Sequence, residues 1–159
     1  MFFESFPDSA RLWVFSLNGQ VPDPEKFQHG LEKFVAGWKA HGSPLKADVE
    51  ILDGQLLLVA ADEEYSSASG CSIDALCNEV TRLSKEAGLS VCGGGEVTFK
   101  IGQSWKAASR AEFQKLIDSD VISKETPVVD ATLTSVGELR TKGVVKPLKE
   151  SWHSQAFKI

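Results

Sequence analysis

Apolar residues in the first part of the chain follow two spacings, one typical of strands and one typical of amphipathic helices. RLWVFSLN (11–18) is a mostly apolar run followed by Gly19, and it predicts a buried strand. Residues 24–41 then carry apolar side chains at helical spacing: Phe27, Leu31, Phe34, Val35 and Trp38. Asp23 is suited to cap this helix and Gly42 to end it. The pattern therefore predicts a strand and then an amphipathic helix.

Two further strand-like runs and a second helix follow. ADVEIL (47–52) and QLLLVAAD (55–62) flank Asp53-Gly54, a dipeptide typical of tight hairpin turns. Beyond the loop 63–71, Ser72 is predicted to cap a helix whose apolar face carries Ile73, Leu76, Cys77, Val80 and Ala87. A strand around 89–92 or 96–101 would complete the order β-α-β-β-α-β. This order predicts an α+β protein with a ferredoxin-like layer, in which helices cover one face of an antiparallel sheet.

The last third of the chain has a less regular pattern. Ser109, with Glu112 three residues later, predicts a short capped helix, and TPVVDATL (126–133) is a candidate strand. The three glycines at 93–95 are suited to a flexible junction. We therefore expect a ferredoxin-like unit over residues 1–92 and a C-terminal α/β extension or small subdomain over residues 93–159, packed on it.

Charge and cysteine spacing exclude several classes of partner. The net charge is −5 and the 17 Lys and Arg residues are dispersed, so a nucleic-acid partner is not expected. The longest apolar runs are far shorter than the roughly 20 residues that a membrane span needs, and no basic region precedes an apolar run at the N-terminus. The three cysteines form no CxxC pair. We expect a reduced, cytoplasmic protein without a membrane partner, a metal or another cofactor.

The stretch SSASGCSIDAL is the strongest candidate for chemistry. If Ser72 caps the second helix, Cys71 lies at the positive end of the helix dipole, where the pKa of a thiol is lowered. Ser69 and Gly70 leave room there for a ligand, or for an anion held by backbone N–H groups. Small residues also suit a tight turn, and free cysteine packs well as a small apolar side chain. Both interpretations stay open.

A thiol nucleophile needs a base, and two histidines are candidates. His41 stands at the predicted end of the first helix, where the helix dipole alone would account for it. His153 follows Trp152 near the C-terminus, where the pair could instead anchor the tail by packing. The sequence does not decide which of them, if either, meets Cys71.

Acidic residues border the same loop. Glu63 and Glu64 follow the third predicted strand, and Asp74 stands in the first turn of the predicted helix. These carboxylates are candidate ligand-binding groups, although a solvated turn and the helix dipole also account for them. Motifs for phosphate-binding loops, dinucleotide binding, serine hydrolysis, zinc proteolysis and EF-hand calcium binding are absent from the sequence.

The chain resembles a family of small, uncharacterised bacterial proteins, best represented in Bacteroidetes and related groups. The resemblance rests on WKAHGSPLKADVEI (38–51), DEEYSSASGCSID (62–74) and VVKPLKESWH (144–153). It implies that six residues occupy signature positions: Cys71, Ser72, Asp74, His41, Trp152 and His153. Members often carry the label ABC transporter ATPase, which the missing phosphate-binding loop does not support here. The resemblance implies no activity.

These patterns favour a protein that works by binding. We expect the 63–74 loop, together with the C-terminal tail, to contact a protein partner or a small ligand, and a homodimer is compatible with this architecture. One alternative is a thiol-dependent enzyme or redox sensor with Cys71 as the reactive residue. Another is anion or phosphate binding at the helix N-terminus that follows Cys71.

Overall fold

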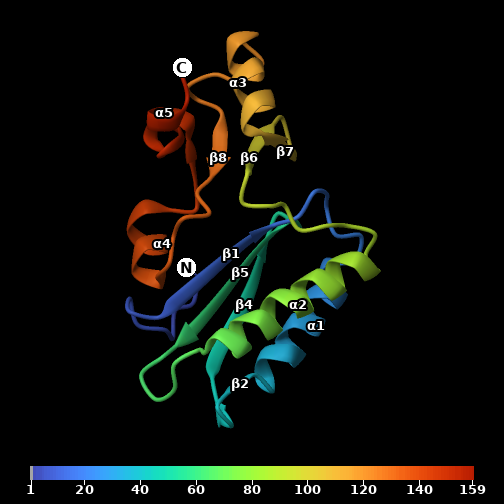
Figure 1. Ribbon diagram of the computed structural model, residues 1–159, viewed down its shortest axis with the longest axis vertical. Coiled ribbons are helices and arrows are strands. Elements are labelled where there is room, and N and C mark those ends of the chain that lie inside the picture. The colour runs from blue at the N-terminus through green and yellow to red at the C-terminus, as the bar shows by residue number, and fades with distance from the viewer. Residues whose placement is uncertain (1) are drawn as a thin grey trace.

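Two antiparallel sheets organise the mixed α+β fold (Figure 1). The computed structural model describes residues 2–159. The first sheet has the order β1-β5-β4 and consists of β1 (Arg11–Ser16), β4 (Lys46–Leu52) and β5 (Leu56–Asp62). The second has the order β7-β6-β8-β9 and consists of β6 (Glu96–Ile101), β7 (Ser104–Ser109), β8 (Pro127–Val129) and β9 (Val145–Pro147). The predicted α+β class is confirmed.

The β4–β5 hairpin forms where the sequence predicts it. Asp53 and Gly54 both have positive φ angles, 53° and 64°, as the two central residues of a type I′ turn require, and the N–H of Gln55 closes this turn by donating to the carbonyl oxygen of Leu52 at 3.1 Å. The pairing runs from Lys46 opposite Asp62 to Leu52 opposite Leu56. Strand β1 adds to the other side of β5, which makes β5 the central strand.

Two helices, α1 (Pro24–Ala36) and α2 (Gly70–Glu86), pack against one face of this sheet. Helix α1 begins as predicted, because the side chain of Asp23 accepts the N–H of Lys26 at 3.1 Å. The predicted end at residue 41 is wrong: the helix stops at Ala36, and a small hairpin follows, β2 (Lys39–Ala40) and β3 (Ser43–Pro44). Trp38 fixes this exit, since its Nε1–H donates to the carbonyl oxygen of Ser72 at 2.8 Å.

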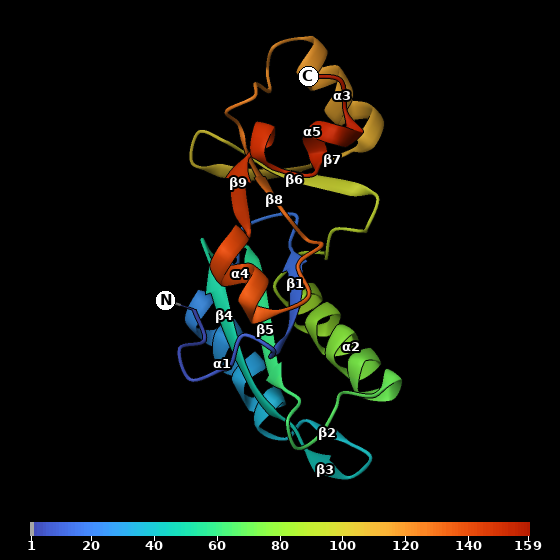
Figure 2. The same ribbon diagram turned by 90° about the vertical axis from the view of Figure 1, so that its left-hand side faces the viewer.

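Both faces of the first sheet are buried. Successive side chains of β5 alternate between two hydrophobic clusters: Leu57, Val59 and Ala61 face the helices, whereas Leu56, Leu58 and Ala60 face the other way. The second cluster is completed by the segment before β1 and by α4 (Val136–Lys142). Figure 1 shows α4 on the side of the sheet opposite α1 and α2, and Figure 2, which is viewed from that side, shows α4 in front of the strands.

The strand that was expected to close the first sheet is not found there within residues 2–159. Residues 96–101 do form a strand, β6, but it belongs to the second sheet. Beside β1 stand only two isolated bridges, Leu17 with Val91 and Arg11 with Ser135. The middle of the outer edge of β1 is therefore left without a partner strand.

The second sheet carries the remaining helices. Ser109 caps α3 (Arg110–Asp118) by accepting the N–H of Glu112 at 3.2 Å, as the sequence predicts. A third hydrophobic cluster lies under α3, the 3₁₀ turn η1 (Leu148–Glu150) and α5 (His153–Ala156), with Phe113 fully buried at its centre.

Side chains join the first 92 residues to the rest of the chain. The buried amide of Gln55 donates to the carbonyl oxygens of Leu17 at 2.9 Å and of Trp105 at 3.2 Å. The Nε1–H of Trp105 in turn donates to Asp53 at 2.9 Å. At the other end of the sheet, Arg140 of α4 donates to the carbonyl oxygen of Phe3 at 2.6 Å. The second hydrophobic cluster also contains residues from both parts of the chain, whereas the first and the third each lie within one part.

Candidate binding site

The loop before α2 is held by hydrogen bonds between its own serines. Ser69 is the cap: its Oγ accepts the N–H of Ser72 at 3.2 Å, and its own N–H donates to the Oγ of Ser72 at 2.6 Å. Ser72 is therefore the third residue of the helix, and its prediction as the cap is wrong. Either serine suits a cap chemically, and the reciprocal pair satisfies two N–H groups at once. The polar atoms of both are used in building the helix start.

Cys71 and His41 are both exposed, on neighbouring elements. Cys71 lies in the first turn of α2, next to Gly70, whose surroundings are open. His41 lies at the tip of the β2–β3 hairpin with a φ of 51°, so the predicted place at a helix C-terminus is wrong. Within residues 2–159, Cys71 makes no hydrogen bond to a histidine. Cys77 is exposed as well, which contradicts its predicted place in the core.

The acidic residues of the loop serve its own structure. A carboxylate oxygen of Glu63 accepts the N–H of Ala68 at 2.7 Å, and the N–H of Glu64 donates to Asp62 at 3.1 Å. Asp74 is exposed and lies beyond the first turn of α2, which contradicts its predicted place in that turn. The structure shows no convergence of these side chains on one point.

Trp152 and His153 lie elsewhere in the molecule. They stand at the start of α5, in the upper part of Figures 1 and 2, whereas the N-terminal end of α2 lies in the lower part of both views. The structure therefore does not bring His153 to Cys71. Instead the two rings stack on each other, with centroids 3.9 Å apart and planes 25° apart.

Ser151 fixes the tautomer of the buried His153 ring. The hydroxyl of Ser151 donates its single hydrogen to the carbonyl oxygen of Leu148 at 2.9 Å. The Ser151 oxygen also lies 3.0 Å from Nδ1 of His153, and with the hydroxyl hydrogen assigned to Leu148 this oxygen accepts, which favours the tautomer with the proton on Nδ1. Burial lowers the pKa of His153 to about 4, which leaves the ring neutral and its Nε2 an acceptor.

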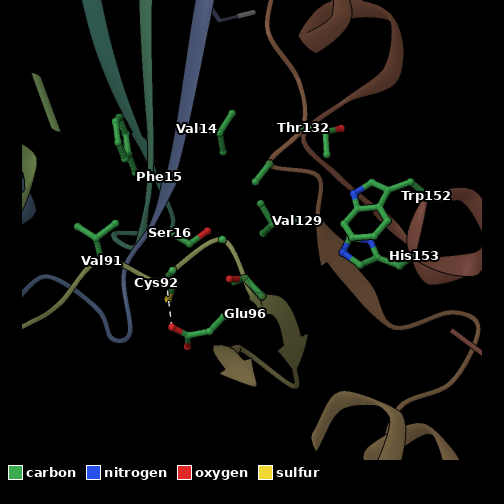
Figure 3. A pocket seen from close by; sticks show the side chains of 14 residues that line it. Val14, Phe15, Ser16, Val91, Cys92, Glu96, Val129, Thr132, Trp152 and His153 are labelled. Carbon is green, nitrogen blue, oxygen red and sulfur yellow. Dashed lines mark hydrogen bonds between the residues drawn. The ribbon is translucent and has the colours of Figure 1, made fainter. Parts of the chain in front are cut away.

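These two rings form one wall of a cavity of about 370 Å³ between the sheets (Figure 3). Strand β1 forms the facing wall, and the segment that leads into β6 forms the base. The lining residues that bear on binding, besides the two rings, are Val14, Ser16, Cys92, Glu96, Val129 and Thr132. The cavity thus lies beside the edge of β1 that has no partner strand.

Backbone groups at this edge are unpaired. Odd-numbered residues of β1 turn their N–H and C=O groups toward β5, and even-numbered residues turn theirs outward. At the two ends the outward groups are satisfied: the N–H of Leu12 donates to Thr134 at 3.0 Å, and the carbonyl oxygen of Ser16 accepts from Cys92 at 2.8 Å. Between them, the N–H and C=O of Val14 have no hydrogen-bond partner among residues 2–159.

A side-chain donor in the opposite wall is unpaired as well. The Nε1–H of Trp152 is buried and has no acceptor in the described part of the chain. Figure 3 places this nitrogen on the side of the indole that faces Val129. The buried indoles of Trp38 and Trp105 both have acceptors, at 2.8 and 2.9 Å. Because an unsatisfied buried N–H costs about 1–3 kcal/mol, an acceptor bound in the cavity would be favoured.

The titratable groups at the base of the cavity favour binding over covalent chemistry. Burial, and then the negative charge of Glu96, raise the pKa of the Cys92 thiol, against a hydrogen bond from Thr98. Cys92 is therefore a neutral thiol at neutral pH and a poor nucleophile. One oxygen of Glu96 accepts the N–H of Gly93 at 3.0 Å, and the carboxylate itself is exposed.

Neither metal chemistry nor a membrane span is indicated in the described region. Residues 2–159 hold no group of three or more His, Cys, Asp or Glu side chains that could bind a metal ion. In the same residues, each helix falls short of the length and apolar character that crossing a membrane demands. Comparison with protein-family models, with curated proteins and with solved structures finds no match to this chain.

Of the predicted site residues, Trp152 and His153 line the cavity, and the others do not. Cys92 and Glu96 were not among the predicted site residues, although they flank the three glycines at 93–95 that the sequence singles out as a junction. Val14 has no sequence signal at all, because the free edge of its strand results from what the distant segments around Val91 and Ser135 leave uncovered.

Proposed function

We propose that this protein is a binding protein whose ligand occupies the cavity between β1 and the stacked rings of Trp152 and His153. The observation that carries this proposal is the buried Nε1–H of Trp152, which lacks an acceptor at the cavity wall. A ligand oxygen or nitrogen placed there would satisfy it. The neutral Nε2 of His153 offers an acceptor beside it for a ligand donor.

The sheet supports the same proposal. We regard β1, β4 and β5 with their two helices as a ferredoxin-like layer in which the position of the fourth strand is only partly filled. The bridges at Leu17 and Arg11 mark the two ends of that position. A ligand in the cavity occupies the middle of this fourth-strand position, next to Val14, where β1 offers an unpaired N–H donor and an unpaired C=O acceptor.

The alternatives centred on the 63–74 loop have weaker support. The side chains of Ser69 and Ser72 are bonded to each other rather than free for a ligand or an anion. Cys71 has no hydrogen-bonded base among the described residues. The three free cysteines do suit a reducing compartment, in agreement with the expected cytoplasmic location.

A fragment screen followed by ¹H–¹⁵N NMR tests the proposal on the intact chain. Amide-containing fragments that bind are expected to shift the indole N–H resonance of Trp152 and the backbone amide of Val14. The indole of Trp38, which is bonded to Ser72, serves as the internal control and should not move. The proposal would be overturned if fragments bind without shifting the resonances of Trp152 and Val14, or if the screen finds no binder.

Two variants sharpen this test. Trp152→Phe retains an aromatic ring but removes the unpaired N–H, and it should weaken the fragments by about tenfold, as the loss of one buried hydrogen bond predicts. Trp13→Phe is the matched control, since Trp13 packs against Trp38 on the helix side of the sheet and does not line the cavity. Equal affinities for the two variants would contradict the role of the indole.

A further inference from the structure

The chemistry of the cavity wall indicates what kind of ligand fits. Val14 presents an N–H and a C=O from the same residue on the same side of a strand. In an antiparallel sheet, these two groups pair with the C=O and N–H of a single residue on the neighbouring strand. The complementary group is therefore an extended peptide unit, and strand addition to a free edge is a common way for proteins to bind peptides.

The two bridges limit the length of such a ligand. Ser135 lies opposite Arg11 and Val91 lies opposite Leu17, so the unoccupied stretch of the edge is centred on residues 13–15. At about 3.3 Å per residue, three residues span roughly 10 Å. A cavity of about 370 Å³ is also small for a binding pocket. The edge accommodates two or three residues beside β1 and not a longer strand.

Charge gives this ligand a direction. Among the described residues that line the cavity, only Glu96 is charged at neutral pH, because His153 and Cys92 are neutral. Figure 3 shows Glu96 beside Cys92 and Ser16, at the end of the cavity away from Thr132. A positive group is favoured at that end. A free peptide N-terminus placed there lets the chain run antiparallel to β1, with its second residue opposite Val14.

We infer that the cavity binds the amino-terminal two or three residues of a peptide, an inference that rests on the proposed function. The terminal ammonium lies near the carboxylate of Glu96. The second residue pairs through its N–H and C=O with Val14. A peptide carbonyl oxygen accepts the Nε1–H of Trp152. The same chemistry is present in a free short peptide and in the exposed N-terminus of a longer chain.

Calorimetry and NMR with defined peptides on the full chain test this inference. The probe is Ala-Val-Ala with a free amino terminus and an amidated carboxyl terminus. It is compared with the N-acetylated peptide and with the peptide methylated on the nitrogen of its second residue. The free peptide should shift the resonances of Trp152 and Val14, and each modification should weaken binding at least about tenfold.

A charge variant adds a control that does not disturb the cavity wall. Glu96→Gln keeps the oxygen that accepts the N–H of Gly93, so the local fold is expected to persist. This variant should bind the free peptide more weakly and bind the acetylated peptide with unchanged affinity. Glu112→Gln, an exposed carboxylate on α3, should affect neither. A twelve-residue peptide with the same first three residues identifies the source: tighter binding indicates a protein N-terminus, and equal binding a short free peptide.

The outcomes separate this inference from the proposed function. If amide fragments shift Trp152 and Val14 but the free tripeptide does not bind, the protein binds another ligand in the same cavity and the peptide inference is overturned. The inference is likewise overturned if N-methylation or acetylation has no effect. If neither fragments nor peptides move these resonances, both proposals fail.

Discussion

At the scale of single residues, the neighbours of His153 decide what its ring can do. The side chain is only 2% exposed, and the hydroxyl of Ser151 accepts its Nδ1–H. Burial is the main cause of its low pKa, and the positive charges of Arg110 and Lys146 act in the same direction, against the carboxylate of Asp130. The result is a neutral ring with one acceptor atom, Nε2, that is available to a ligand donor. The site does not favour the protonated, cationic form of the ring.

This environment predicts a pH-dependent stability. The unfolded chain binds a proton at His153 near pH 6.5, whereas the folded chain does so only near pH 4. Between these values the unfolded state holds more protons, so the free energy of unfolding should fall by up to about 3 kcal/mol as the pH falls. Urea unfolding at pH 7 and pH 4.5 measures this fall in the free energy of unfolding. In the His153→Gln variant, the part of the pH dependence that comes from His153 should be absent.

The exposed His29 provides the control for that experiment, because His29→Gln removes a histidine from the surface of α1 without touching the core. An NMR titration of the His153 ring gives its pKa directly, even if the His153→Gln variant folds poorly. A titration midpoint near 6.5 in the folded protein would show that the ring is not desolvated as the structure indicates.

At the scale of elements, α2 shows how a loop with candidate chemistry can be structural. Its start is a reciprocal hydrogen-bond pair of two serines, and a carbonyl of its first turn is bonded to Trp38. Its two cysteines are free and exposed. The composition that points to a ligand site in the sequence is also what a capped helix start needs.

Replacing the cap should therefore cost stability. Ser69→Ala removes the side-chain oxygen that accepts the N–H of Ser72, and we expect a loss of about 1 kcal/mol in the free energy of unfolding. Urea unfolding checks this value. Ser67→Ala is the matched control, because Ser67 is exposed and makes no hydrogen bond in the described structure, and it should change stability by less than about 0.5 kcal/mol. Equal effects would exclude Ser69 as the cap.

At the scale of the whole molecule, the first sheet depends on the rest of the chain. One of its faces packs on residues that lie far along the sequence, among them Val136 and Leu139 of α4. The amide of Gln55 joins the two sheets through the carbonyl oxygens of Leu17 and Trp105. The cavity exists only because both sheets are present, since its walls come from each of them.

Accordingly, residues 1–92 alone should not form a stable fold. Without the C-terminal part, Leu12, Leu56 and Leu58 would be exposed on the open face of the sheet. We expect poor dispersion in the ¹H–¹⁵N spectrum of this fragment. For the full chain we expect a single unfolding transition that is the same by tryptophan fluorescence and by circular dichroism. A well-dispersed fragment spectrum would establish an independent N-terminal domain.

Local signals in the sequence predicted local structure well. Asp23 and Ser109 cap their helices, and Asp53-Gly54 forms the hairpin turn, because each depends on bonds to residues a few positions away. The predicted cap of α2 was displaced to Ser69, three residues before Ser72, and two further predictions were wrong where distant contacts decide the outcome. Helix α1 ends early, at Ala36, and Trp38 just beyond it reaches across to α2. Cys77 is exposed although it shares the helical period of the core residues.

The sequence by itself determined the α+β class and most strands and helices. It also identified Trp152 and His153 as candidate site residues. The tertiary structure decided that these two residues face the edge of β1 across a cavity and lie away from Cys71. The physical reason is that a cavity depends on which backbone and side-chain groups remain unpaired after the chain has packed. The free groups of Val14 and Trp152 are defined by segments more than seventy residues away from β1, which no local pattern encodes.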